Sequence, residues 1–109
     1  MKYCSRIVLV DNENEFFTPE AVELIKLIDT QKSIKAAADL MKISDGKAKK
    51  YIKAIEKYLG ESAVVKTRGA DVDGYNVHIS PACRSLLEKY ENFVKQSEAA
   101  IKKNFDLIF

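Results

Sequence analysis

Six lysines lie within residues 42–57, where only two acidic residues accompany them. The local net charge is therefore +4, which leaves −2 for the rest of a 109-residue chain whose total is +2. Ammonium groups at this density are suited to neutralising phosphate and releasing its counterions. The total charge is too small to mark the whole chain as a binder of nucleic acid, so the segment predicts a local electrostatic surface. The lysines are Lys42, Lys47, Lys49, Lys50, Lys53 and Lys57.

Residues 44–59 have the pattern of an amphipathic helix that positions most of these lysines. At about 100° per residue, one side is apolar and the opposite side is basic. The apolar side holds Ala48, Ile52, Ile55 and Leu59, flanked by Tyr51 and Tyr58. The basic side holds Gly46, Lys49, Lys50, Lys53 and Lys57. A lysine-rich outer face is often only the solvated side of a helix, so its neighbours in the chain decide what it indicates.

A second, shorter helix precedes the basic one. Ser33 is placed to cap it, and its inward side consists of Ile34, Ala37, Ala38 and Met41, with Leu40 beside them. After a break at residues 42–43, Ser44 caps the basic helix, Asp45 complements its dipole, and Gly60 ends it. Two helices joined by a short turn predict a helix-turn-helix over about residues 33–60, with residues 44–59 as the helix that enters the DNA major groove.

The remaining elements are predicted from strand and cap signals. Residues 3–10 indicate a strand that ends at the polar residues 11–15, and Thr18-Pro19 opens a helix over about residues 19–30. Residues 63–67 and 75–79 indicate two strands of a hairpin, joined by residues 68–74. We expect this hairpin to form a wing over about residues 61–80. Together the signals predict one mainly α domain, residues 1–109, with an N-terminal strand and a small β-hairpin wing.

Ser80-Pro81 opens a long last helix, which we expect over about residues 81–106. Its apolar residues recur at steps of three and four and continue almost to the end of the chain. We predict that this stripe pairs with a second copy across a two-fold axis, although it could instead fold back on the first helix of its own chain. The predicted interface residues are Leu86, Tyr90, Phe93, Val94, Ile101, Phe105 and Ile108.

Catalytic and metal-binding patterns are weak in this sequence. Cys4 and Cys83 lack the CxxC pairing of a zinc site, and we expect both to be ordinary, partly buried thiols. His78 has no Cys or acidic residue at metal spacing, so it is expected to be an ordinary strand residue. We expect no enzyme, no metal and no cofactor, and the short apolar N-terminal run predicts no export or membrane segment and a cytoplasmic protein.

Several short motifs resemble the winged helix-turn-helix of LysR-type and ModE-type regulators. They are Ser33-Ile34-x-x-Ala37-Ala38, then Ile43-Ser44, then Ile52-x-x-Ile55-Glu56-x-x-Leu59-Gly60. The strand before the first helix, the Val64-Val65-Lys66 step into the wing, and Ile79-Ser80 before the last helix favour the molybdate-responsive ModE branch. The resemblance covers roughly residues 5–95.

The resemblance implies a dimeric transcription factor that binds a palindromic operator in double-stranded DNA. The residues expected at DNA are Ser33, Ser44, Asp45, Gly46, Lys47, Lys49, Lys50 and Lys53, with Lys66 and Arg68 of the wing at the backbone. The sequence differs from the ModE pattern in carrying Lys49 in place of an aromatic residue, Asp71 and Asp73 in the wing, and Cys83 in place of a glycine. No effector domain follows, so we expect a free-standing DNA-binding domain that relies on a separate effector or partner protein.

Two further readings remain open. Gly46 in the first turn costs the helix up to about 1 kcal/mol relative to alanine, which indicates either close approach of its backbone to DNA or simple tolerance near a helix end. The alternative function is a protein-interaction module that docks a partner through its apolar C-terminal helix, especially residues 105–109.

Overall fold

The computed structural model describes residues 1–68 and 75–109. These residues form a mainly helical structure with two small antiparallel sheets. The first sheet pairs β1 (Leu9–Asp11) with β2 (Asn14–Phe17), and the second pairs β3 (Val64–Arg68) with β4 (Tyr75–Ile79). The helices are α1 (Pro19–Gln31), α2 (Ile34–Met41), α3 (Asp45–Leu59) and α4 (Pro81–Ile108).

Each of these helices begins at a hydroxyl cap. The side chains of Thr18, Ser33, Ser44 and Ser80 each accept a hydrogen bond of 3.1 Å from the backbone N–H three residues further on. A cap of this kind satisfies one of the N–H groups that a helix leaves unpaired at its start. The predicted starts of the helices are therefore confirmed, and α4 continues two residues beyond its predicted end.

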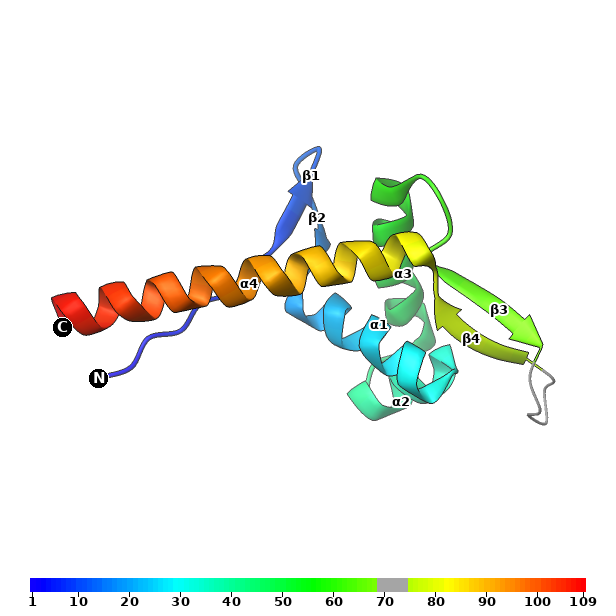
Figure 1. Ribbon diagram of the computed structural model, residues 1–109. Helices are drawn as coiled ribbons and strands as arrows, with labels where there is room; N and C mark the ends of the chain where they lie inside the picture. Colours follow the sequence, from blue (N-terminus) through cyan, green and yellow to red (C-terminus); the bar gives the residue numbers. More distant parts are fainter. Residues whose placement is uncertain (69–74) are drawn as a thin grey trace.

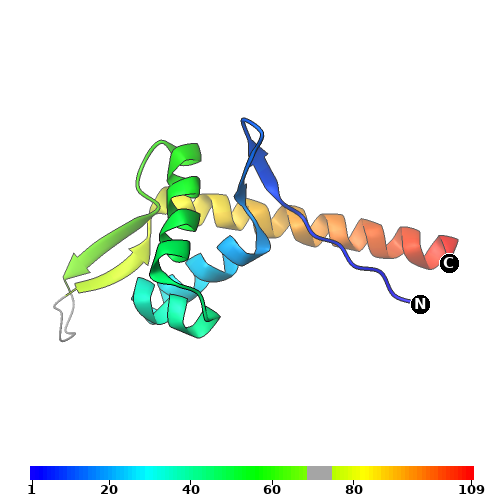
Figure 2. The ribbon, with the colours of Figure 1, turned by 180° about the vertical axis from the view of Figure 1, so that it is seen from behind.

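The core lies between α1, α2 and α3, and α4 crosses one side of it. Leu24, Ile25 and Ile28 of α1 are fully buried together with Phe17 of β2 and Ile55 of α3. The first part of α4 crosses α3, lying in front of it in Figure 1 and behind it in Figure 2. Because α4 runs well beyond the core, the molecule is elongated, with extents of 55 × 29 × 23 Å.

The predicted strand over residues 3–10 is wrong in its bounds. Only Leu9–Asp11 is a strand, and the polar residues expected to end it include the start of β2. Asn12 and Glu13 form the tight turn between β1 and β2, with φ angles of 49° and 66°. In hairpins this left-handed conformation is usually adopted by Asn-Gly. The hairpin forms nevertheless, because Phe16 and Phe17, the last two residues of β2, are buried in the core.

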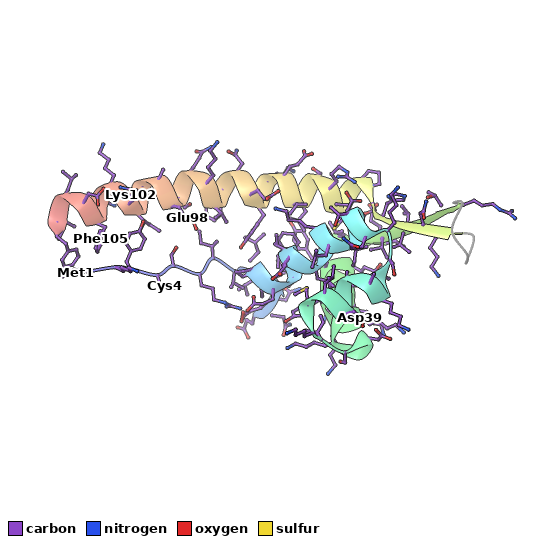
Figure 3. The ribbon with its side chains drawn as sticks, turned by 90° about the horizontal axis from the view of Figure 1, so that it is seen from below. Met1, Cys4, Asp39, Glu98, Lys102 and Phe105 are labelled. Carbon is purple, nitrogen blue, oxygen red and sulfur yellow. The ribbon has the colours of Figure 1, made fainter. Side chains whose placement is uncertain are left out.

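The N-terminal segment, residues 1–8, covers part of α4. Tyr90 donates a hydrogen bond of 2.7 Å to the carbonyl oxygen of Ile7, and the Tyr3 ring lies 4.8 Å from that of Phe105. Figure 3 shows this segment running alongside the C-terminal half of α4, with Phe105 on the side that faces it. The sequence analysis expected the apolar side of this half of α4 to be covered by a second copy or by the first helix. It did not predict a contact with the N-terminal segment. Within the described residues, no helix is both long enough and apolar enough to cross a membrane.

Candidate nucleic-acid interface

The turn between α2 and α3 has a defined geometry. Lys42 adopts the left-handed conformation at φ 58°, and its N–H bonds to the carbonyl oxygen of Asp39 at 3.1 Å. The next N–H, that of Ile43, bonds back to Ala38 at 3.0 Å. This pair of bonds is the Schellman motif, which usually places glycine at the left-handed position. The motif fixes the direction in which the chain leaves α2, and Ser44 then starts α3.

The lysines of α3 lie on its exposed side. Ala48, Ile52 and Ile55 are buried, with Ile52 the most accessible of the three at 6 %. The lysines on this helix are all exposed and consist of Lys47, Lys49, Lys50, Lys53 and Lys57. The predicted division between an apolar inner side and a basic outer side is confirmed, except that Tyr58 is 46 % exposed and stacks on Phe16 at 4.2 Å.

The remaining predicted residues near the start of α3 differ in what they can offer. Ser44 and Asp45 are exposed, whereas Ser33 is half-buried, and the oxygens of both serines already accept a capping hydrogen bond. Their hydroxyl protons remain available as donors. At Gly46 an added Cβ would meet only the Ser44 Oγ, at 3.9 Å. The packing of the chain itself therefore does not require glycine at this position.

The acidic residues of the N-terminal hairpin lie near the other end of α3. Asp11 and Glu15 line a small cavity of about 40 Å³ with Lys57 and Tyr58. Carboxylates repel phosphate, so the C-terminal end of α3 is less favourable to a polyanion than its N-terminal half. The basic surface is therefore concentrated around Lys47, Lys49 and Lys50.

The β3–β4 hairpin is joined to the helices through its base. The N–H of Val77 donates to the carbonyl oxygen of Lys32 at 3.0 Å, and the N–H of Ile79 donates to Asp29 Oδ1 at 3.2 Å. On the other strand, Ala63 N–H donates to Glu56 Oε2 at 2.9 Å. Asp29 and Glu56 were not identified from the sequence, because a carboxylate that accepts a distant backbone N–H has no local sequence signature.

Asp29 also forms an ion pair with α4. Arg84 Nη2 lies 3.0 Å from its Oδ2, and His78 Nδ1 lies 4.0 Å from its Oδ1. Burial opposes ionisation of this carboxyl, but the hydrogen bonds from Arg84 and from the Ile79 N–H outweigh it and hold the pKa of Asp29 below its usual value. The ionised carboxylate thus connects α1, β4 and the first turn of α4. His78 is a half-buried strand residue beside this group.

Lys66 and Arg68 lie on β3 and are exposed. They are two residues apart, so they project from the same face of the hairpin, opposite Val77 and Tyr75 in the register. The strand pairing of Lys66 is as predicted, whereas Arg68 was expected in the loop and instead pairs with Tyr75 at the end of β3. The predicted wing-tip residues Asp71 and Asp73 lie outside the described residues.

The predicted dimer residues divide into three groups. Tyr90 is only 7 % exposed and packs edge-on against Phe17 of its own chain at 5.1 Å, which leaves little of its surface for a partner. Phe93 and Ile108 are exposed, at 53 % and 74 %. The others are half-buried and comprise Leu86, Val94, Ile101 and Phe105.

The two cysteines have different environments. Cys83 is fully buried, and burial raises its pKa to about 11, so its thiol stays protonated at neutral pH. Cys4 is exposed, which contradicts the expectation that it is partly buried. In the described part of the chain, His, Cys, Asp and Glu side chains form no group of three or more that could hold a metal ion.

Comparison of the chain with protein-family models and with curated proteins finds no match.

Proposed function

We propose that this protein is a sequence-specific DNA-binding transcriptional regulator with a winged helix-turn-helix fold. In this proposal α2 and α3 form the helix-turn-helix, α3 is the recognition helix, and the β3–β4 hairpin is the wing. The observation that carries the proposal is the row of exposed lysines on α3, a helix whose opposite side is buried and whose start is fixed by the turn at Lys42.

The shape of α3 suits the major groove. An α-helix with its side chains is about 10–12 Å across, and the major groove is about 12 Å wide. The N-terminal half of the helix, which is the more basic end, approaches the base edges, and Lys49, Lys50 and Lys53 neutralise phosphates on either side. Lysine selects bases less sharply than the guanidinium fork of arginine, so a large part of the affinity comes from phosphate contacts.

The wing adds a second set of cations. Lys66 and Arg68 project from one face of β3, which is joined to α3 through Glu56. In the proposed complex they contact the DNA backbone beside the groove that α3 occupies, as wing residues do in the ModE-type and LysR-type domains that the sequence resembles.

We propose that the regulator acts as a homodimer on a palindromic operator in the cytoplasm. Exposed apolar side chains on α4 support the proposal that a second copy packs against this helix. Those more than half exposed are Phe93, Leu107, Ile108 and Phe109. A two-fold pair would place two copies of α3 at half-sites about 34 Å apart, one turn of DNA.

The second candidate is a protein-interaction module, and the same apolar end of α4 favours it. Leu107, Ile108 and Phe109 are 74–77 % exposed, and a partner protein could cover them instead of a second copy. The two candidates differ in solution behaviour. The module is monomeric alone and does not bind DNA, whereas the regulator is dimeric and does.

The proposal is tested by binding of the purified protein to duplex DNA at about 50 and 200 mM salt, a range over which phosphate contacts lose affinity steeply. Binding at the lower salt that weakens strongly at the higher salt supports it, and absence of binding at both contradicts it. Selection of bound duplexes from a random pool then identifies the operator.

A further inference from the structure

We propose that Asp29 and Glu56 are positioning residues that set the placement of the wing cations Lys66 and Arg68 relative to the lysines of α3. This inference rests on the proposed DNA-binding function. Neither carboxylate is expected to contact DNA, because both would repel phosphate. Each carboxylate accepts a hydrogen bond from a backbone N–H of the hairpin or of its base, so its effect on DNA binding is indirect.

The hairpin needs support from outside itself. A two-stranded ribbon is at best marginally stable in water, and this one is five residues long on each strand. Figure 1 shows it projecting from the helical part of the molecule, to which the middle of β4 is also joined by the hydrogen bond from the Val77 N–H to the carbonyl oxygen of Lys32. A small change in the angle of the hairpin at its base therefore produces a larger displacement at Arg68, the last described residue of β3.

Asp29 holds the β4 side of that base. Its Oδ1 accepts from the Ile79 N–H at 3.2 Å, and both of its oxygens lie within 3.1 Å of Arg84 Nη2. The carboxylate is half-buried on α1, so it is anchored to the core helix that packs against α3. Arg84 in turn orients the carboxylate from the first turn of α4.

Glu56 holds the β3 side directly from α3. Its Oε2 accepts from the Ala63 N–H at 2.9 Å, one residue before β3 begins. Ala63 is fully buried, and its carbonyl oxygen accepts from the Ser80 N–H at 2.8 Å, which closes the base of the hairpin. The helix that carries the lysines and the strand that carries Lys66 and Arg68 are thus joined by one side chain.

The two carboxylates hold the two strands from two different helices. A hydrogen bond to a charged group contributes more to stability than a neutral one, so loss of either carboxylate loosens the base of the hairpin without removing any cation. The structure therefore assigns the relative position of the two cationic groups to residues outside the DNA surface.

The experiment compares Asp29→Ala and Glu56→Ala with the wild type in DNA binding over a salt series. Each phosphate contact contributes about 1 to the slope of log affinity against log salt. We expect both variants to bind severalfold more weakly and with a slope shallower by about 1–2, since Lys66 and Arg68 no longer reach the backbone together. Glu56→Gln keeps an acceptor oxygen and is expected to restore most of the affinity.

The control is Glu23→Ala, which removes an exposed carboxylate of α1 and is expected to bind DNA as the wild type does.

A comparison of multiple variants shows whether Asp29 positions Lys66 and Arg68 or only stabilises the fold. In a Lys66→Ala, Arg68→Ala background, Asp29→Ala is expected to cause no further loss of affinity, because the residues it positions are gone. A further loss of the same size overturns the inference, as does unchanged affinity and slope in the folded single variants. Arg84→Ala, which leaves the Asp29 bond to Ile79 in place, is measured in parallel in case Asp29→Ala does not fold, and a smaller loss in the same direction is expected.

Failure of the proposed function is distinguishable from failure of this inference. Absence of DNA binding by the wild type contradicts the function. Amide hydrogen exchange at Ile79 and Ala63 in the free protein still tests the positioning, with faster exchange expected in Asp29→Ala and Glu56→Ala respectively. Unchanged exchange in both variants overturns it.

Discussion

The phenolic oxygen of Tyr90 lies 2.7 Å from the carbonyl oxygen of Ile7, and this hydrogen bond joins residues 83 positions apart. Tyr90 is nearly buried, so its replacement by phenylalanine leaves the packing but removes the donor. We expect Tyr90→Phe to lower the free energy of unfolding by about 1 kcal/mol, measured by urea denaturation at neutral pH. An unchanged free energy would mean that the N-terminal segment does not hold this bond in solution.

The same tyrosine predicts a pH dependence. Burial raises the pKa of Tyr90, so its contribution to stability is complete below the unfolded pKa of about 10 and is lost as pH rises through the folded value. The wild type should therefore lose stability above about pH 10 more steeply than Tyr90→Phe. Parallel urea curves at pH 8 and pH 11 check this, and equal losses in the two proteins would contradict it.

Lys42 is the non-glycine residue at the left-handed position between α2 and α3, at φ 58°. A side chain in this conformation costs energy that glycine does not, so Lys42→Gly should raise the free energy of unfolding by roughly 0.5–1 kcal/mol. Lys53→Gly is the matched control, because Lys53 is exposed in the interior of α3, where glycine should lower stability by about 1 kcal/mol. Thermal or urea unfolding gives both values, and the same sign for the two would contradict the assigned turn.

The proposed homodimer depends on the exposed apolar side of α4. Phe93 and Leu107 are 53 % and 75 % exposed, so glutamate at both should leave the fold intact and convert the dimer to a monomer. Light scattering after gel filtration measures the mass. Leu40→Glu is the control, since Leu40 is 59 % exposed on α2, and it should stay dimeric. A monomeric wild type would instead favour the protein-interaction module.

One variant of Gly46 distinguishes the two interpretations of this residue, which are close approach of the helix backbone to DNA and simple tolerance near a helix end. An added methyl has room in the free protein, so Gly46→Ala should stabilise α3 by about 0.5 kcal/mol. If the helix backbone approaches DNA closely, the same methyl should weaken DNA binding severalfold. Unfolding and DNA titration on one preparation measure both effects. Increased stability with unchanged affinity would show that glycine is only tolerated there.

The helices could be predicted from the sequence because their signals are local. Thr18, Ser33, Ser44 and Ser80 each precede an apolar pattern of helical period, and each caps a helix in the structure. The basic side of α3 followed from the same periodicity.

The parts that could not be predicted depend on distant contacts or unusual residues. The Asn12-Glu13 turn has no glycine, so the first hairpin lacked its usual signature. The contact between Tyr3 and Phe105 joins the two ends of the chain, and no local pattern predicts it. The roles of Asp29 and Glu56 depend in the same way on backbone groups that only the folded chain brings near.

The central claim is that the lysine side of α3 binds DNA. The most direct test is duplex binding by a Lys49→Ala, Lys50→Ala variant, compared with Lys89→Ala, Lys95→Ala, which removes two exposed lysines of α4. The α3 variant should keep its stability, lose about tenfold or more in affinity at low salt, and show a salt slope shallower by about 2, while the α4 variant binds as the wild type. Equal affinity and slope for all three proteins would contradict the claim.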